Sequence, residues 1–379
     1  MLFMKRTLPL AVLAALGTGT AHADVRVNGF ANLTAGLTGS DETLYGYDDN
    51  VDFNAQSLFA IQVSGDVNDK ITATGQIVAR GESDYDANFE WAYMTYEVSD
   101  SVSVSAGRIR MPLFKYSASL DVGYSYHWVV APQSVYDVPF NNVDGVRADY
   151  NGYAGDLEYS LQAIVGRVKS DFTLAGAPAD LTIDNVVLVT GDFTYNNWNF
   201  RGVYATGQST FDIPALAPAL DSLTAIDPNL GNLLAATEDS GVFYGMSIAY
   251  DRYDWFVAGE YTGVEIEDSF YPDDINYYVT AGIRSGKWTP FVTYEKSDTN
   301  SGFKFLNQVG AFPEALQPTV TQLLVGLQQP AIGESTTLSL GVRYDLDTNV
   351  AIKADVIQST DDIADTDTNL MRVAVNYIF

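Results

Sequence analysis

The sequence predicts an all-β protein, a transmembrane antiparallel β-barrel of about sixteen strands. Two patterns predict this fold. Apolar residues recur at every second position over long segments, and short and long connections alternate between these segments. A period of two is that of a strand with one apolar face. Strict alternation places every short turn at one end of the strands and every long loop at the other, which is the plan of an outer-membrane barrel.

The first 23 residues are expected to be a secretory signal peptide. Lys5 and Arg6 form a basic start, residues 8–16 form an apolar core, and residues 21–23 read Ala-His-Ala, a small-residue cleavage site. The apolar core is too short to cross a bilayer as a helix, and no later segment is long enough to do so. We therefore expect residues 24–379 to form the exported barrel domain.

Composition excludes several kinds of protein. The chain contains no cysteine, so disulfides, cysteine metal sites and thiol nucleophiles are absent. Removal of Lys5 and Arg6 with the signal peptide would move the formal net charge from −28 to −30. Such acidity argues against nucleic acid as a partner, because phosphate binding needs basic patches. No cofactor is predicted.

The alternation of apolar and polar residues begins directly after the signal peptide. Val25, Val27, Leu33 and Leu37 lie in one set, and residues such as Arg26 lie in the other. The same pattern recurs in residues 71–80, 157–165, 242–250, 338–345 and 350–356. Many of these segments begin or end with an aromatic residue, as in the girdles at the two membrane interfaces. The alternative, a soluble all-β protein, explains neither the alternating connections nor the small and polar second face.

The connections between strands fall into two classes. Seven are short and rich in Gly, Asn and Asp, the usual turn residues. They lie near residues 66–69, 99–100, 151–155, 196–197, 251–254, 285–287 and 347–349. Eight are longer, and they lie near residues 38–50, 81–88, 111–142, 166–183, 207–240, 264–275, 297–335 and 359–367. Because only helices and closed barrels satisfy their backbone in lipid, the sheet is expected to close.

The third long connection, residues 111–142, is the leading candidate for a functional loop. It contains three prolines, a dense set of aromatic residues and several acids. A loop of this length in a compact domain is usually functional. A barrel of about sixteen strands is also wide enough for an aqueous channel, and the charged second face of the strands suits such a channel.

Short motifs around this loop resemble the general diffusion porins of Gram-negative outer membranes. The motifs are residues 90–96, Gly107 with Arg108, and residues 145–150. The last strand, which alternates apolar residues and ends with Tyr377 and Phe379, resembles the terminal strand of outer-membrane proteins. In those proteins the final aromatic residue is implied to be the signal that the barrel-assembly machinery reads.

The resemblance implies a location and a mechanism. The protein would lie in the outer membrane, in contact with lipid and lipopolysaccharide, as a homotrimer with short periplasmic turns and long extracellular loops. The third loop would fold into the barrel and narrow the pore, with wall arginines facing loop carboxylates. The residues carried over are Arg80, Arg108 and Arg147 on the wall and Asp121, Asp137 and Asp144 on the loop side.

Two features depart from the porin pattern. The loop lacks a Pro-Glu-Phe-Gly-Gly type of tip and is rich in aromatic residues instead. Candidates for contact with a ring-bearing solute are Tyr116, Tyr124, Tyr126 and Trp128. In addition, Arg108 is in step with Val102, Val104 and Ala106, the set expected to face lipid. It reaches the lumen only if a bulge near Gly107 shifts the register.

Other long loops raise further possibilities. Residues 214–236 and 305–329 carry leucines at helical spacing, which predicts short helices that cap the pore mouth, pack on a neighbouring subunit or pack on their own barrel. Acidic clusters near residues 41–49, 265–274 and 361–367 are either solvated or hold divalent cations that bridge to lipopolysaccharide. We predict no specific metal site.

The predicted function is a passive channel for small hydrophilic solutes and ions. The first alternative is a substrate-selective channel for a sugar or an aromatic solute, lined by the loop aromatics. An alternative of another class is a surface receptor or adhesin. An enzyme is not expected, because the mature chain has a single histidine, His127, and no catalytic residues are identified.

Overall fold

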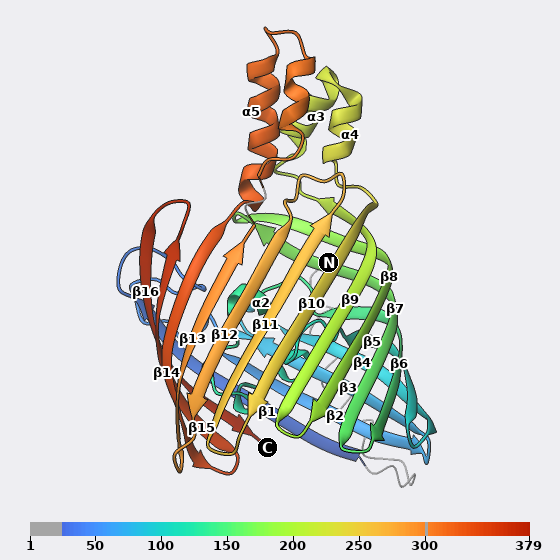
Figure 1. The fold of residues 1–379 in the computed structure, drawn as a ribbon, viewed down its shortest axis with the longest axis vertical. Helices are drawn as coiled ribbons and strands as arrows, with labels where there is room; N and C mark the ends of the chain where they lie inside the picture. The colour runs from blue at the N-terminus through green and yellow to red at the C-terminus, as the bar shows by residue number, and fades with distance from the viewer. Residues whose placement is uncertain (1–24, 300–301) are drawn as a thin grey trace, which may run out of the picture.

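The computed structural model describes residues 25–299 and 302–379. The predicted signal peptide lies outside these residues. Within them, sixteen antiparallel strands form one closed barrel in which each strand pairs with its neighbours in sequence and β1 pairs with β16 (Figure 1). The strands are β1 (Val25–Thr38), β2 (Leu58–Asn68), β3 (Ile71–Arg80), β4 (Ala87–Ser99), β5 (Val102–Arg110), β6 (Asn142–Ala154), β7 (Leu157–Leu174), β8 (Ala177–Tyr195), β9 (Trp198–Asp212), β10 (Asp239–Asp251), β11 (Trp255–Ile266), β12 (Asp274–Ile283), β13 (Trp288–Asp298), β14 (Glu334–Asp347), β15 (Val350–Asp361) and β16 (Thr366–Ile378). The predicted fold class is confirmed.

The two faces of the strands differ as the alternation predicts. On β16, Met371 and Val373 are exposed on the outside of the barrel, whereas Arg372 and Asn376 are buried on the inside. Aromatic rings gather on the outer face near the short turns, in pairs such as Trp198 with Tyr250. Such a belt is expected where a barrel crosses a membrane interface.

The connections also follow the predicted alternation, with two differences. The predicted long connection at residues 359–367 is short, because β15 ends at Asp361 and β16 begins at Thr366. We refer to the two ends of the barrel as the short-turn end and the long-loop end. The predicted long connection at residues 166–183 is instead an extension of β7 and β8. These strands run to a two-residue turn at Ala175 and Gly176, where both φ angles are positive. A two-residue turn with positive φ angles matches the twist of two paired strands. The pairing of β7 with β8 therefore continues up to the turn.

Short helices stand beyond the long-loop end (Figure 1). The connection between β9 and β10 forms α3 (Ala217–Ile226) and α4 (Pro228–Leu234), and the connection between β13 and β14 contains α5 (Gln317–Gln328). Leu223, Leu230, Leu234, Val320 and Leu324 are buried in one cluster between them. The helices predicted in residues 214–236 and 305–329 are therefore present and pack on one another. Among the described residues, no helix has the length and apolar character needed to cross a membrane.

The barrel closes where β1 meets the end of the chain. Gly29 and Phe379 exchange two backbone hydrogen bonds, of 2.9 and 3.0 Å. A Cβ atom on Gly29 would lie 2.2 Å from the ring of Phe379, so the ring covers the glycine on the outer surface. The ring also stacks on Phe59 of β2 and on Tyr377. Phe379 and Tyr377 thus belong to the closing seam of the barrel.

Candidate functional site

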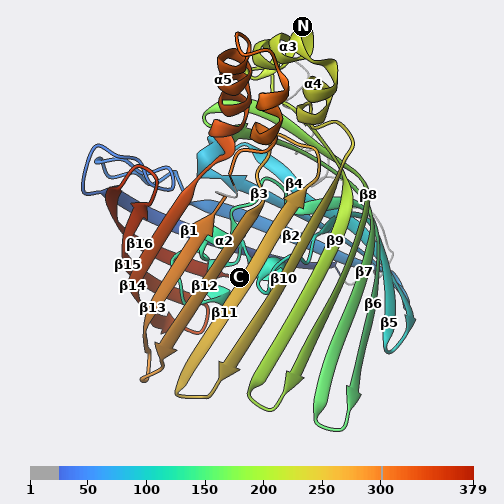
Figure 2. The ribbon, with the colours of Figure 1, turned by 45° about the horizontal axis from the view of Figure 1, so that its top comes forward.

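The third long loop lies inside the barrel. It joins β5 to β6 and contains two short 3₁₀ turns and the single-turn helix α2 (Gln133–Tyr136). In both Figure 1 and Figure 2, α2 lies within the ring of strands. α2 contacts β11, β12 and β13, which lie across the barrel from β5. The loop therefore crosses the lumen.

Apolar packing holds the loop against one side of the wall. Phe114 of the loop packs on Tyr136 and on Phe243 of β10. The inner positions of the neighbouring strands are apolar too, and the same cluster contains Ile164, Val168, Val186, Leu188, Val203, Ala205 and Phe291. The inner wall is thus asymmetric, because the inner positions of β2 to β6 carry polar residues such as Gln62, Thr74 and Thr95.

Most of the aromatic residues proposed as solute contacts belong to this packing. Trp128 is only 3% exposed and its Nε1 donates to Oγ1 of Thr293 over 2.8 Å. Tyr126 is 5% exposed and its hydroxyl donates to the carbonyl of Leu120. Tyr116 packs edge-on against Trp128. These contacts help to fix the shape of the loop. Trp128 and Tyr126 are buried, whereas Tyr116 is half-buried, and Tyr116 and Tyr126 both border a cavity at the short-turn end.

Tyr124 has a different environment. Its ring lies 4.7 Å from the guanidinium of Arg343, and its hydroxyl donates to the carbonyl of Thr348 in a short turn. It therefore borders the short-turn end of the lumen. A cavity of about 470 Å³ lies there, and its charged lining residues are Lys115, Asp251, Arg284, Arg343 and Asp345, with His127 also in the wall.

A group of four charged residues, here called the charge cluster, joins the loop to β3, β4 and β5. Oδ1 of Asp121 lies 2.8 Å from Nη1 of Arg80, and Oδ2 lies 3.3 Å from Nη1 of Arg110. Glu90 bridges the same two arginines, at 3.0 Å from Arg80 and 2.6 Å from Arg110. Burial raises the pKa of Asp121, but the two guanidinium groups outweigh it and hold this pKa below its ordinary value.

Two buried wall carboxylates also hold the loop. Glu260 of β11 accepts hydrogen bonds from the hydroxyl of Tyr136, at 2.5 Å, and from the backbone amide of Lys115, at 2.8 Å. Glu295 of β13 accepts from the amide and the hydroxyl of Ser134. Charge-assisted hydrogen bonds of this kind are stronger than neutral ones. These acids therefore act as anchors for the loop.

Two other wall cations, Arg343 and Lys353, bind the backbone of the loop. Nη1 of Arg343 donates to the carbonyls of Tyr124 and Tyr126, at 2.6 and 2.8 Å. Nζ of Lys353 donates to the carbonyl of Trp128 at 2.6 Å and also to that of Gly123. These contacts were not predicted from the sequence, because partners for the cations were sought among acidic side chains, and every residue has a backbone carbonyl.

Arg147 and Asp137 lie outside the charge cluster. Arg147, on the inner face of β6, pairs with Asp149 at 2.8 Å, and its guanidinium lies 6.0 Å from the ring centre of Tyr93. Asp137 follows α2 and its side chain is exposed to the lumen. Because the surrounding wall limits its hydration, the pKa of Asp137 is raised.

Arg108 and Asp144 do not join the charge cluster. Arg108 pairs with Ala92 and with Asp144 across the sheet, in step with Ala106 and Val146 on the outer face. Gly107 has a φ of +135°, but no extra residue enters either ladder there, so the register does not shift. The Arg108–Asp144 pair lies outside the barrel, with side chains 45% and 53% exposed.

The residue that takes the expected place of Arg108 is Arg110. It is the last residue of β5, where the chain turns inward, and its Nε donates to the carbonyl of Ser117 in the loop. A signal for it exists in the sequence, since Pro112 marks the end of the strand two residues later. A side chain at the end of a strand need not point to the face that the alternation predicts.

The single histidine of the described residues, His127, is packed among aromatic rings. His127 stacks on Trp128 and its Nε2 lies 3.1 Å from Oγ1 of Thr280. Burial, together with the neighbouring cations, holds the pKa of His127 well below its ordinary value, so the ring stays neutral. In residues 25–299 and 302–379, no group of three or more His, Asp or Glu side chains is placed to hold a metal ion.

Comparison with known proteins identifies the fold. No family model and no curated protein matches the sequence. Solved structures match almost the whole chain. The outer membrane channel DcaP of Acinetobacter baumannii has a TM-score of 0.61 at 12% identity, with 96% of this chain and 99% of that chain covered. The anion-selective porin from Comamonas acidovorans has a TM-score of 0.57 at 9% identity, with 94% and 100% covered.

The fold is that of the outer-membrane porins. A third match, the trimer form of in-vitro folded OmpT, an outer membrane protein of Vibrio cholerae, has a TM-score of 0.50 at 12% identity and covers 94% of this chain and 99% of that chain. The resemblance to Gram-negative porins that the sequence motifs indicate is thereby confirmed at the level of the fold. At these identities, the likeness concerns the porin fold and not a shared solute.

Proposed function

We propose that this protein is a passive channel of the Gram-negative outer membrane for small hydrophilic solutes and ions. The observation that carries the proposal is the position of the third loop. It packs against part of the apolar side of the wall, and the charge cluster holds it to the polar side. Solutes would pass between the loop and the inner wall of β2 to β6.

The proposed constriction has charges of both signs. Asp121 is its loop residue, and Arg80, Glu90 and Arg110 belong to the wall, as do Arg147 and Asp149. Asp137, which is exposed on the loop, would lie beside the path. Opposed charges in a narrow, low-dielectric passage order water and favour polar solutes over apolar ones. Arg108 and Asp144 have no part in this constriction.

The substrate-selective alternative receives no specific support from the loop aromatics. Tyr126 and Trp128 are buried in the loop, so little of their ring surface is left for a sugar, and the half-buried Tyr116 packs edge-on against both. The mature protein would be exported by its signal peptide and assembled through its last strand by the barrel-assembly machinery. Its outer surface would contact lipid and lipopolysaccharide.

A homotrimer is part of the proposal. The outer face of β2 to β5 has a shallow hollow whose lining includes the small residues Gly65, Ala73, Gly75, Ala92 and Ala106. Closely approaching barrels need such a surface. The trimer form of OmpT supports the same assembly. Mass measurement of the protein extracted in mild detergent would give three copies, and a monomer at all concentrations would contradict this part of the proposal.

The experiment that tests the channel uses the absence of cysteine. Thr74→Cys places a thiol on the inner wall of β3, along the proposed path. Thr262→Cys is the matched control, since Thr262 is buried on the inner face of β11 on the side that the loop covers. Single-channel conductance is then recorded in a planar bilayer with asymmetric salt, before and after a charged methanethiosulfonate reagent.

We expect long-lived open steps for the unmodified protein. A negatively charged reagent should lower the conductance of Thr74→Cys and shift its reversal potential toward cation preference, whereas Thr262→Cys should not respond. A folded barrel that never conducts would contradict the channel. A response of Thr262→Cys in place of Thr74→Cys would contradict the proposed path.

A further inference from the structure

The inner wall at the long-loop end is apolar over four neighbouring strands. Leu181 and Ile183 of β8, Ala205 of β9, Phe243 of β10 and Val264 of β11 all line the same space. The interior of a water-filled barrel is normally polar. Only part of this surface is covered by the third loop, so the remaining apolar surface needs another explanation.

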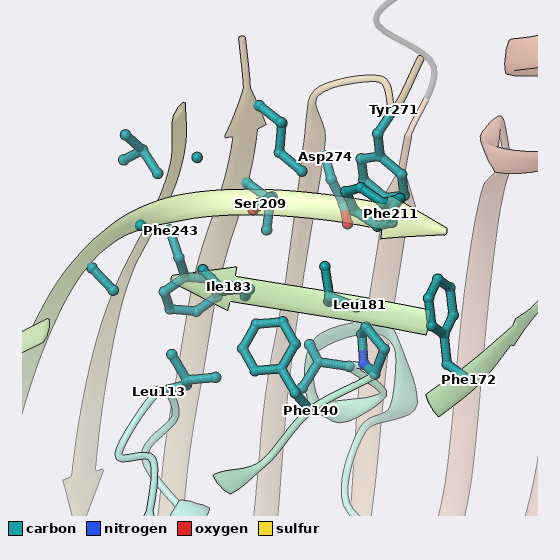
Figure 3. Close-up of a pocket in the computed structure, with 18 of the residues that line it drawn as sticks. Leu113, Phe140, Phe172, Leu181, Ile183, Ser209, Phe211, Phe243, Tyr271 and Asp274 are labelled. Atoms are coloured by element: carbon teal, nitrogen blue, oxygen red, sulfur yellow. The ribbon is translucent and has the colours of Figure 1, made fainter. Parts of the chain in front are cut away.

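A cavity of about 450 Å³, here called the vestibule, lies between this wall and the loop. Leu113 and Phe140 of the loop lie on one side of it, and Phe211, Tyr271 and Asp274 lie together at one end (Figure 3). Pockets that bind small organic molecules usually have volumes of about 300 to 1,000 Å³. The vestibule therefore has room for one ring-bearing molecule.

The charged groups of the vestibule are of one sign. Asp137 and Asp274 are the charged residues that line it, and no lysine, arginine or histidine belongs to the lining. Asn276 donates to Oδ1 of Asp274 at 2.6 Å. Lys304 contacts the carbonyl of Ile266 at the edge of the vestibule, but its charge is paired with Asp273 at 3.2 Å.

Aromatic rings accompany the two carboxylates. The rings that line the vestibule are Phe140, Phe172, Phe211, Phe243 and Tyr271. The face of an aromatic ring attracts a cation within about 6 Å. Carboxylates beside aromatic rings are suited to an amine or a quaternary ammonium group, whereas an anion would meet like charge without a compensating donor of positive charge.

We propose that the vestibule is a binding site for an organic cation, a molecule with an apolar, ring-bearing body and one protonated amine or quaternary ammonium group. The apolar wall of β8 to β11 takes the ring, and Asp137 and Asp274 face the charge. The site is built from residues outside the proposed constriction apart from Asp137, and binding there does not require passage through the barrel.

Binding is tested directly with purified full-length protein in detergent micelles, by calorimetric titration against protein-free micelles. Benzyltrimethylammonium is the cation, and phenylacetate is an anion of similar size. The test variant is the double substitution Asp137→Asn and Asp274→Asn. Asp180→Asn is the matched control, because Asp180 is an exposed acid at the same end of the barrel that does not line the vestibule.

The native protein should bind benzyltrimethylammonium, and phenylacetate should bind about tenfold more weakly or not at all. The double variant should lose about tenfold in affinity for the cation, while Asp180→Asn should bind like the native protein. Phe211→Leu, which keeps an apolar side chain and removes a ring, should weaken cation binding with both carboxylates intact.

Three results would overturn the proposal: no cation binding by a barrel that is folded by circular dichroism, equal binding of the anion, or unchanged binding in the double variant. The outcome is independent of conductance. A protein that conducts without binding the cation refutes the vestibule site alone, and a protein that binds the cation without conducting refutes the channel alone.

Discussion

Asp121 of the third loop lies between two arginines of the wall, with Oδ1 at 2.8 Å from Nη1 of Arg80. Its other oxygen faces Arg110, and its backbone carbonyl accepts a hydrogen bond from Asn32 of β1. One loop residue thus ties together three separate strands of the barrel. This contact decides how close the loop lies to the polar side of the lumen.

Removal of the Asp121 charge should loosen the loop. Asp121→Asn leaves Arg80 and Arg110 with Glu90 as their shared acid, so two cations compete for one carboxylate. Loss of one partner of a buried pair costs about 3 kcal/mol of unfolding free energy. We expect a loss of this order in urea unfolding of the folded barrel, together with noisier single-channel currents.

Asp144→Asn is the control for this change. It also removes a carboxylate paired with an arginine, but the Arg108–Asp144 pair is exposed on the outer face. Exposed pairs contribute about 0 to 1 kcal/mol. The conductance of Asp144→Asn should equal that of the native protein, and a large effect there would contradict the outward position of Arg108 and Asp144.

The contribution of Asp121 should depend on pH in a defined direction. Its pKa in the folded protein lies below the ordinary value of about 3.9, so the ionised form is favoured by folding. The stabilisation is then complete above the ordinary pKa and is lost as the pH falls through the lowered pKa of the folded state. The difference in unfolding free energy between the native protein and Asp121→Asn should shrink below about pH 4. A difference that grows on acidification would contradict this assignment.

Lys353 should be required for the position of the loop near the short-turn end. It is buried, and its ammonium group satisfies the carbonyls of Gly123 and Trp128. Lys353→Met keeps the length of the side chain but leaves both carbonyls without this donor, at a cost of about 1 to 3 kcal/mol. The fluorescence of the protein should shift to longer wavelength as Trp128 becomes hydrated. Lys70→Met, at an exposed turn, is the control and should leave fluorescence and stability unchanged.

Gly29 should be required for the closing seam of the barrel. A methyl group there would lie 2.2 Å from the ring of Phe379 and 2.8 Å from the carbonyl of Ala60. Gly29→Ala should therefore displace the ring and slow folding into lipid vesicles, as followed by electrophoretic mobility. In the double variant with Phe379→Ala, the ring is already absent, so the added effect of Gly29→Ala should be smaller. Fully additive effects would argue against contact between the two residues as the cause.

The sequence alone determined the architecture, because the alternation of apolar and polar residues in each strand shows that its two faces contact different environments. In β16, Met371 and Val373 alternate with Arg372, so one face of the strand must contact an apolar environment and the other a polar one. Sixteen strands of this kind can satisfy all their backbone hydrogen bonds in lipid only by closing into a barrel. The helices beyond the long-loop end were also readable, since their leucines repeat at helical spacing. The two-residue turn at Ala175 and Gly176 was missed, because register shifts between Gly166 and Val168 and between Asp184 and Val187 interrupt the period of two in the strands that it joins.

The tertiary structure alone decided which charges meet. Arg108 and Arg110 are two residues apart and share the same place in the alternation, yet one lies outside the barrel and the other contacts Asp121. The reason is that β5 ends at Arg110, where the chain turns into the loop. The path of the loop decided that Lys353 and Arg343 bind carbonyls and that Trp128 is packed. The apolar vestibule is likewise a property of four strands and a loop brought together. The alternation of a strand predicts whether a side chain faces the inside or the outside of the barrel. Which side chain it contacts across the lumen depends on packing between residues far apart in the chain.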